Sequence, residues 1–273
     1  MRIYAAIVYF FLYAPIGMLM LFSFSAGRQA STFEGFSTQW YGKAAENRFL
    51  VEAATTSLSI AALSAILAAI IGTMAALSLP RLGGVPRKLY EGTIQVALMI
   101  PGIVIAIATL IMLATMLAGA NDLLLSIFPE AKKLELGFWS IVAAHTLFNI
   151  ALVIVIVRAR LAGMDRALME ASADLYATPL GTFRQVTLPL ILPAIIAGGL
   201  LSFTFSFDDY IIASFVNGSE VTLPLFIFNS IRRGLTPEVN AVATVVFTSS
   251  LIILLSAQFL LRRGAKGKRG GVR

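Results

Sequence analysis

The chain of 273 residues contains no cysteine, which excludes disulfides, thiolate metal sites and cysteine nucleophiles. It has one histidine, His145, which makes a histidine-based metal site or histidine-based acid–base catalysis improbable. Charge is also scarce, because Asp, Glu, Lys and Arg make up 13% of the residues, whereas a soluble domain has about 25%. No catalytic triad, metal cluster or phosphate loop is recognisable. The sequence therefore predicts neither an enzyme nor a chain that binds a metal or cofactor itself.

Long apolar runs dominate the sequence, and 58% of the residues are hydrophobic. A helix needs about 20 apolar residues to cross the core of a bilayer. Six runs have this length, at 3–24, 53–79, 93–118, 137–157, 191–216 and 239–261. The first is too long for the apolar core of a signal peptide and is interpreted as a retained helix. We expect an all-α membrane protein with six transmembrane helices in a single domain over 1–273.

The distribution of Lys and Arg predicts the orientation of these spans. If the N-terminus is inside, the inner segments hold 14 of these residues and the outer segments 7, as the positive-inside rule requires. Both termini are then cytoplasmic, and the basic segment 264–273 is expected to be a disordered tail near anionic lipid. The aromatic residues of the outer segment 25–52 suggest an interfacial position. The net charge of +7 is scattered rather than clustered, so nucleic acid is not an expected partner.

The inner segment 158–190 is too long for a simple turn. Apolar residues at three- and four-residue spacing predict a short amphipathic helix over 165–176. Thr178-Pro179 should end this helix, and a second helical piece should end at Leu188-Pro189. Such a helix–turn–helix in the cytosol is suited to binding a partner.

This segment resembles the EAA loop of ABC-importer permeases, in which Glu-Ala-Ala is followed after three residues by Gly and nine residues later by Ile-x-Leu-Pro. Glu170, Ala171 and Leu188-Pro189 match this pattern, while Ser172, Tyr176 and Val186 depart from it. Tyr176 is the largest departure, because it replaces the glycine of the turn. We call residues 158–190 the EAA loop. The resemblance implies contact with an ATP-hydrolysing subunit through Glu170, Ala171, Ser172, Asp174, Leu175, Tyr176, Ala177 and Leu180.

Further motifs narrow the resemblance. The segments 36–41, 206–210, 222–225 and 234–241 are similar to those of the spermidine/putrescine permease subfamily, and most to its PotC-type members. This resemblance implies the type I (MetI-like) permease fold and a multi-pass protein of the bacterial inner membrane that imports polyamines. It also implies a second permease subunit, a periplasmic binding protein and a dimer of ATP-binding subunits, which would use ATP and Mg.

Two acids interrupt the fifth span. Asp208 and Asp209 are the only charged residues within a predicted span, and a charge in hydrocarbon costs at least about 2.5–3.5 kcal/mol. They are candidates for a substrate path that accepts a polycation, although a structural ion pair or an interfacial position would also account for them. Adjacent helical residues point about 100° apart, so the two acids should contribute unequally.

Three other residues complete the candidate path. Tyr210 follows the acids, and Phe228 and Arg232 lie four residues apart on one helical face of the next segment. Phe228 could face a cation, and a plain rim helix is the alternative. His145 fits a hydrogen-bonded packing role better than a proton relay. Pro101-Gly102 should allow a kink in the third span.

Two alternatives remain open. The same machinery could carry another small solute, such as an opine or an aminophosphonate. An ion-coupled secondary transporter is the other class, but it predicts inverted repeats and buried ionisable pairs, and neither is evident.

The topology is directly testable, because the natural chain has no cysteine. Cysteines introduced at Ser31 and Ser172 should react with an impermeant reagent from opposite sides of the membrane. Labelling of both from the same side would contradict the six-span arrangement.

Overall fold

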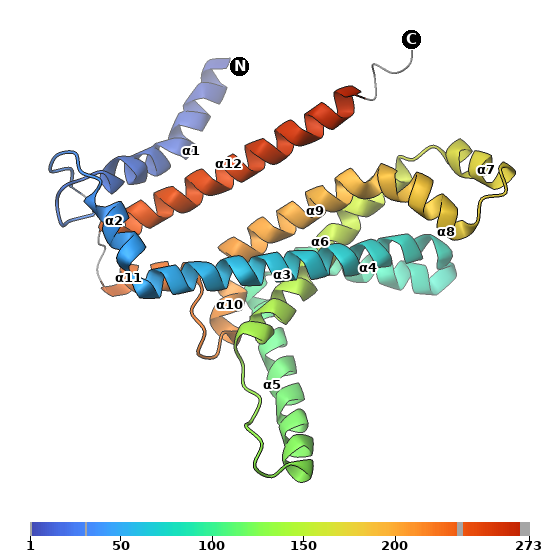
Figure 1. The fold of residues 1–273 in the computed structure, drawn as a ribbon, viewed down its shortest axis with the longest axis horizontal. Helices are drawn as coiled ribbons and strands as arrows, with labels where there is room; N and C mark the ends of the chain where they lie inside the picture. The colour runs from blue at the N-terminus through green and yellow to red at the C-terminus, as the bar shows by residue number, and fades with distance from the viewer. Residues whose placement is uncertain (1, 31, 234–236, 268–273) are drawn as a thin grey trace. The chain divides into compact units, whose positions relative to one another are not determined.

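The computed structural model describes residues 2–30, 32–233 and 237–267, with side chains described up to Ile252 except at positions 2, 3, 81, 166 and 233. Figure 1 shows a chain that is almost entirely helical, with one isolated bridge between Ser25 and Phe36. The residues divide into two compact units, one formed by 1–55 with 223–273 and one by 56–222. The sequence had predicted a single domain, and each unit is described in turn.

The first unit joins the two ends of the chain. It contains α1 (Arg2–Ser23), α2 (Gln39–Glu46), the start of α3 (Arg48–Ser78), α11 (Leu223–Arg233) and α12 (Pro237–Gly267). Both α1 and α2 pack against α12. Two amides hold this packing: Asn47 donates to the carboxylate of Glu238 at 2.7 Å, and Asn240 donates to the carbonyl of Ala30 at 2.9 Å.

The sequence suggests an interfacial position for the aromatic residues after α1, and the structure shows that one of them packs inside the unit. Trp40 is buried, and its indole N–H donates to the carbonyl of Ser25 at 2.9 Å. Phe36 stacks on Phe24 with ring centroids 5.4 Å apart, although it remains largely exposed. Trp40 is therefore a packing residue of this unit, because its polar N–H finds a partner inside the chain.

The second unit holds the rest of α3 and the helices that follow it. The helices are α4 (Gly84–Met99), α5 (Gly102–Ile127), α6 (Phe138–Ala162), α7 (Arg166–Asp174), α8 (Pro179–Thr182), the π-helical turn η2 (Phe183–Thr187), α9 (Leu188–Asp208) and α10 (Ile211–Val216). A short 3₁₀ turn, η1 (Leu79–Arg81), ends α3.

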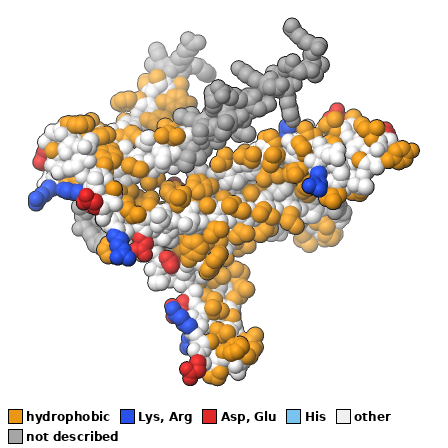
Figure 2. All heavy atoms as spheres, viewed as in Figure 1, with side chains coloured by type: hydrophobic (Ala, Val, Ile, Leu, Met, Phe, Trp, Pro, Cys, Tyr) orange, Lys and Arg blue, Asp and Glu red, His pale blue; other side chains and the backbone are white. Residues whose placement is uncertain are grey.

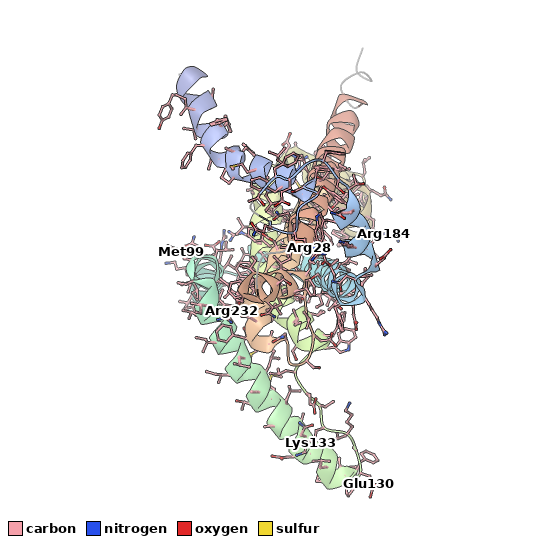
Figure 3. All side chains as sticks on the ribbon, turned by 90° about the vertical axis from the view of Figure 1, so that its left-hand side faces the viewer. Arg28, Met99, Glu130, Lys133, Arg184 and Arg232 are labelled. Atoms are coloured by element: carbon pink, nitrogen blue, oxygen red, sulfur yellow. The ribbon has the colours of Figure 1, made fainter. Side chains whose placement is uncertain are left out.

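The predicted third span, 93–118, is two helices in place of one kinked helix. Ile100 and Pro101 are extended and separate α4 from α5, because proline has no N–H and disfavours helical geometry in the residue before it. Helix α5 then continues to Ile127, with Met99 near its start and Glu130 and Lys133 in the loop that follows its end and turns back along the helix (Figure 3). Hydrophobic side chains cover its visible face, and charged ones gather at the loop that follows (Figure 2).

Five described helical segments are long and apolar enough to cross a membrane, and Pro237–Ile252 is a shorter apolar one. The all-α membrane fold is confirmed. The backbone of α12 is helical to Gly267, so the first part of the predicted tail 264–273 continues this helix. Residues 268–273 of that tail lie outside the described residues, as do the side chains of the sixth predicted span beyond Ile252.

Helices α3, α6 and α9 form the closely packed core of the second unit. A Cβ placed on Gly72 of α3 would lie 2.8 Å from Cβ of Val153 on α6. A Cβ on Gly198 of α9 would lie 3.5 Å from the same valine. Lipid gives no hydrophobic drive for helices to associate, so close contact of small residues is what holds them together.

This packing predicts opposite effects for two glycine substitutions in long apolar helices. Gly72→Ala should lower the free energy of unfolding by about 1–3 kcal/mol, because Val153 must move. The matched change Gly119→Ala meets nothing within 4 Å and should be neutral or stabilise α5 by up to about 1 kcal/mol. Thermal unfolding in detergent measures both, and equal effects would contradict the packing described for Gly72.

Candidate functional site: the EAA loop and the acidic break after α9

The EAA loop is held in shape by its own hydrogen bonds. Asp165 caps α7 by accepting the N–H of Ala167 at 2.9 Å, and Thr178 caps α8 by accepting the N–H of Gly181 at 3.2 Å. The hydroxyls of Ser172 and Thr182 lie 2.8 Å apart and join α7 to α8. Each cap typically contributes about 1 kcal/mol, so the turn between α7 and α8 is well defined.

Most of the residues assigned to partner contact lie on the outside of this loop. The exposed ones are Glu170, Ala171, Asp174, Leu175, Tyr176, Ala177 and Leu180. Ser172 is buried and hydrogen-bonded, so it supports the loop from within. A cysteine at Asp174 is consequently a better labelling position than one at Ser172.

Tyr176, which stands where the EAA pattern has glycine, has a left-handed backbone conformation of the kind that favours glycine. Its φ is +56°, and its N–H donates to the carbonyl of Ala173 at 2.9 Å. The glycine turn is therefore kept although glycine is absent. A residue with a Cβ pays roughly 1–2 kcal/mol for this conformation, and the Tyr176 side chain is 96% exposed.

The sequence predicts that the second helical piece of the EAA loop ends at Leu188-Pro189, and this prediction is wrong. The backbone passes from α8 through η2 into α9 without a break, giving one helical segment of 30 residues from Pro179 to Asp208. The wider π turn lies just before Pro189, where the missing N–H removes a hydrogen bond from the ladder.

A cavity of about 1060 Å³ lies between the EAA loop and the ends of α3 and α6. Arg87 and Arg158 line it, and both contact the carboxylate of Glu91, at 3.2 Å and 2.7 Å. The hydrogen bond from Arg87 and the charge of Arg158 hold the pKa of Glu91 below its usual value, against the opposing effect of desolvation. Sequence reasoning missed this link between α4 and α6, because the two partners are 67 residues apart.

The predicted fifth span, 191–216, is also interrupted, and the two acids lie at the interruption. Helix α9 ends at Asp208, and α10 begins at Ile211. The carboxylate of Asp209 accepts the N–H of Ile212 at 2.7 Å and that of Ala213 at 3.2 Å. Asp209 thus satisfies the free donors at the start of α10 and has a structural role.

Asp209 also ends a buried chain of polar side chains. The hydroxyls of Ser64 and Ser206 are 2.8 Å apart, and Nδ1 of His145 lies 2.7 Å from the Ser206 hydroxyl. Nε2 of His145 is 3.6 Å from Oδ1 of Asp209, which is too long for a hydrogen bond. The chain connects α3, α6 and α9 to the break, in agreement with a packing role for His145.

Asp208 differs from its neighbour. It is exposed, and among the described residues it has no hydrogen-bond or ion-pair partner. Asp209 lies just outside α9 in an extended conformation, so the difference between the two acids comes from the break and not from the 100° offset of adjacent residues on a helix. Asp209 is committed to the protein itself, and Asp208 presents a carboxylate that is available to a ligand.

The remaining path candidates lie in both units. Tyr210 stands at the break itself, partly buried, between α9 and α10. In the other unit, the guanidinium carbon of Arg232 lies 5.6 Å from the ring centroid of Phe228, so both residues share one face of α11 as their spacing predicts. This contact is a cation–π pair within the chain, which engages Phe228 with Arg232.

Comparison with known proteins identifies the family. The family model "Binding-protein-dependent transport system inner membrane component" matches residues 68–267. The chain belongs to this family. The spermidine/putrescine permease PotC of Escherichia coli K12 is 38% identical to it, over 97% of this chain and 95% of the relative. The putrescine permease PotI of the same organism is 40% identical, over 94% of this chain and 88% of the relative.

Solved structures share the permease fold. A bacterial ABC transporter that imports alginate superposes with a TM-score of 0.71 and 16% identity, over 96% of this chain and 94% of that chain. The MetNI methionine transporter in an inward-facing form superposes with a TM-score of 0.61 and 16% identity, over 79% of this chain and 95% of that chain. These likenesses show that this family member has the fold of type I importer permeases.

The capping role of Asp209 predicts a contrast with Asp208. Asp209→Ala should lower the free energy of unfolding by about 1 kcal/mol, because two N–H groups of α10 lose their acceptor. Asp209→Asn keeps an oxygen acceptor and should lose less, and Asp208→Ala should have no effect. Thermal unfolding in detergent tests this order, which equal losses at the two positions would contradict.

Proposed function

We propose that this chain is a permease subunit of an ATP-driven importer that carries polyamines into the cell. The observation that supports this most strongly is the 38–40% identity with PotC and PotI over nearly the whole chain. Such coverage includes both compact units and the EAA loop, so the resemblance is not confined to a shared membrane scaffold.

The proposal assigns ATP hydrolysis to other subunits. A dimer of ATP-binding subunits binds ATP and Mg and contacts the EAA loop, a second permease completes the path, and a periplasmic binding protein delivers the substrate. The exposed carboxylates of Glu170 and Asp174 and the apolar tip at Leu175 and Leu180 support a protein partner at this loop. In this arrangement both termini and the EAA loop are cytoplasmic, as the excess of Lys and Arg in these segments favours.

The same proposal gives Asp208 a role in the path. A polyamine is a flexible polycation, and an unpaired carboxylate at a helix break can offset part of its charge without a buried ion pair. Asp209 supports this role indirectly, because it fixes the start of α10 and hence the geometry of the break. Alternating access follows if ATP binding favours one of two arrangements of the permease pair.

The proposal is tested by uptake of radiolabelled putrescine and spermidine. The permease would be reconstituted in proteoliposomes with the second permease, ATPase and binding protein encoded with it. Uptake should require ATP inside the liposomes. Asp208→Asn should slow uptake roughly three- to fivefold, the equivalent of about 1 kcal/mol for one exposed charge contact. The matched variant Asp122→Asn, also exposed but on α5, should transport normally.

Glu170→Ala tests the coupling of ATP hydrolysis to transport separately from the substrate path. A charge-assisted hydrogen bond is worth roughly 1.5–3 kcal/mol, so this variant should weaken ATPase association by at least tenfold or uncouple hydrolysis from transport. If the wild-type assembly takes up neither putrescine nor spermidine when ATP is present, the proposed substrate is wrong. Unchanged assembly and ATPase stimulation in Glu170→Ala would contradict the coupling role.

A further inference from the structure

Asn149 on α6 and Ser202 on α9 are buried polar residues whose side chains have no hydrogen-bond partner within the described part of the chain. The oxygen and the nitrogen of the Asn149 amide are both unpartnered, and so is the hydroxyl of Ser202. Asn149 is 1% exposed and Ser202 is fully buried. Buried polar groups almost always have a partner, either in the protein or in an ordered water. These two side chains therefore need a partner from outside the chain.

The packing of α6 on α9 places the two side chains opposite each other. The helices lie side by side in the second unit (Figure 1). Their contacts include His145 with Ser206 and Val153 with Gly198. The two unpartnered residues lie midway between these pairs on both helices, four positions from each. In an antiparallel register they consequently occupy one layer, because residues four apart share a helical face.

Helix α3 closes this layer with a small residue. Ser64 of α3 contacts the layer on one side of it, and Gly72 contacts the layer on the other side. Ala68 is midway between them on the same helical face and is fully buried. We call Ala68, Asn149 and Ser202 the Asn149 layer. Its α3 residue has only a methyl group, so no large side chain from α3 fills the space beside the two polar groups.

The composition of the Asn149 layer determines what it can hold. None of its three residues is charged, so a buried ion would find no compensating charge there. Each residue is at most 1% exposed, which limits a ligand to a very small molecule. A buried water typically makes about three hydrogen bonds to polar groups that would otherwise be unsatisfied. The layer has the neutral donors and acceptors that a water requires.

We infer that a water molecule is bound in the Asn149 layer and bridges the Asn149 amide on α6 to the Ser202 hydroxyl on α9. The amide supplies one acceptor and two donors, and the hydroxyl can act as either. The hydroxyl of Thr146, three residues before Asn149 on α6, is also buried and unpartnered and is available for a further bond. The water extends the buried polar chain that ends at Asp209 by one layer. It stops at Val153, whose layer has no polar side chain. This water is bound whatever substrate the permease carries.

The direction of the stability change in Ser202→Ala tests the water bridge. If the water is present, this variant loses a hydrogen bond of the bridge, and its apparent unfolding temperature in detergent should fall by about 2–4 °C. Without the water, the same change only removes an unpartnered polar group, and the temperature should stay the same or rise. Asn149→Leu keeps the branched shape of the side chain and should cause a similar fall. The double variant should lose less than the sum of the two, because either single change already disrupts the bridge.

Thr204→Val is the matched control on α9. Its hydroxyl donates to the carbonyl of Leu200 in the same helix at 3.0 Å, a type of bond that contributes little to helix stability, so the unfolding temperature should change little. A density map of the wild-type permease that resolves buried waters should show one within about 3.2 Å of both Asn149 and Ser202. The inference is wrong if such a map shows buried waters elsewhere but none in this layer. It is also wrong if Ser202→Ala does not lower the unfolding temperature, or if the two single losses add fully in the double variant.

Discussion

The close approach of α3, α6 and α9 is the constraint on which the second unit depends. At Gly72 and Gly198 the backbones come near enough to Val153 that one methyl group on the first glycine would collide. The contacts between α6 and α9 step along both helices in opposite directions, from His145 opposite Ser206 to Val153 opposite Gly198. Antiparallel helices in this register exclude lipid and bring polar groups together where the spacing allows. In a membrane, such contacts take the place of the hydrophobic effect.

The acidic break is a consequence of that register. Because His145 and Ser206 are fixed to each other, the end of α9 is fixed, and Asp209 can satisfy the first donors of α10. The backbone polar groups exposed at a helix break need partners, either in the protein or in solvent. Asp209 meets this requirement for the break, whereas the adjacent carboxylate of Asp208 has no hydrogen-bond or ion-pair partner within the described part of the chain. The two acids share a sequence context and have different physical roles.

The sequence predicted the helical membrane fold and the position of the EAA loop, because apolar run length and motif spacing are local properties. It also located a disturbance at Pro101, but it could not tell a kink from a complete break. The break after Asp208 contains no proline or glycine, so the sequence did not predict it. It depends on hydrogen bonds to Asp209 and on packing against His145, which are properties of the folded chain. At position 176 the motif has glycine, and this sequence has tyrosine. Whether the left-handed turn forms with a tyrosine depends on the balance between backbone strain and the capping hydrogen bonds of Asp165 and Thr178, which the sequence alone does not give.

The continuity of η2 with α9 gives the EAA loop a mechanical connection to the acidic break. The helical segment Pro179–Asp208 has 30 residues and is therefore about 45 Å long. If it moves as a rod, a tilt of about 5° at one end displaces the other by about 4 Å, roughly three quarters of the 5.4 Å length of one helical turn. The π turn before Pro189 and the proline at position 193 are the two points where the rod can bend. Stiffness at these two points sets how much of a displacement at the loop arrives at Asp208.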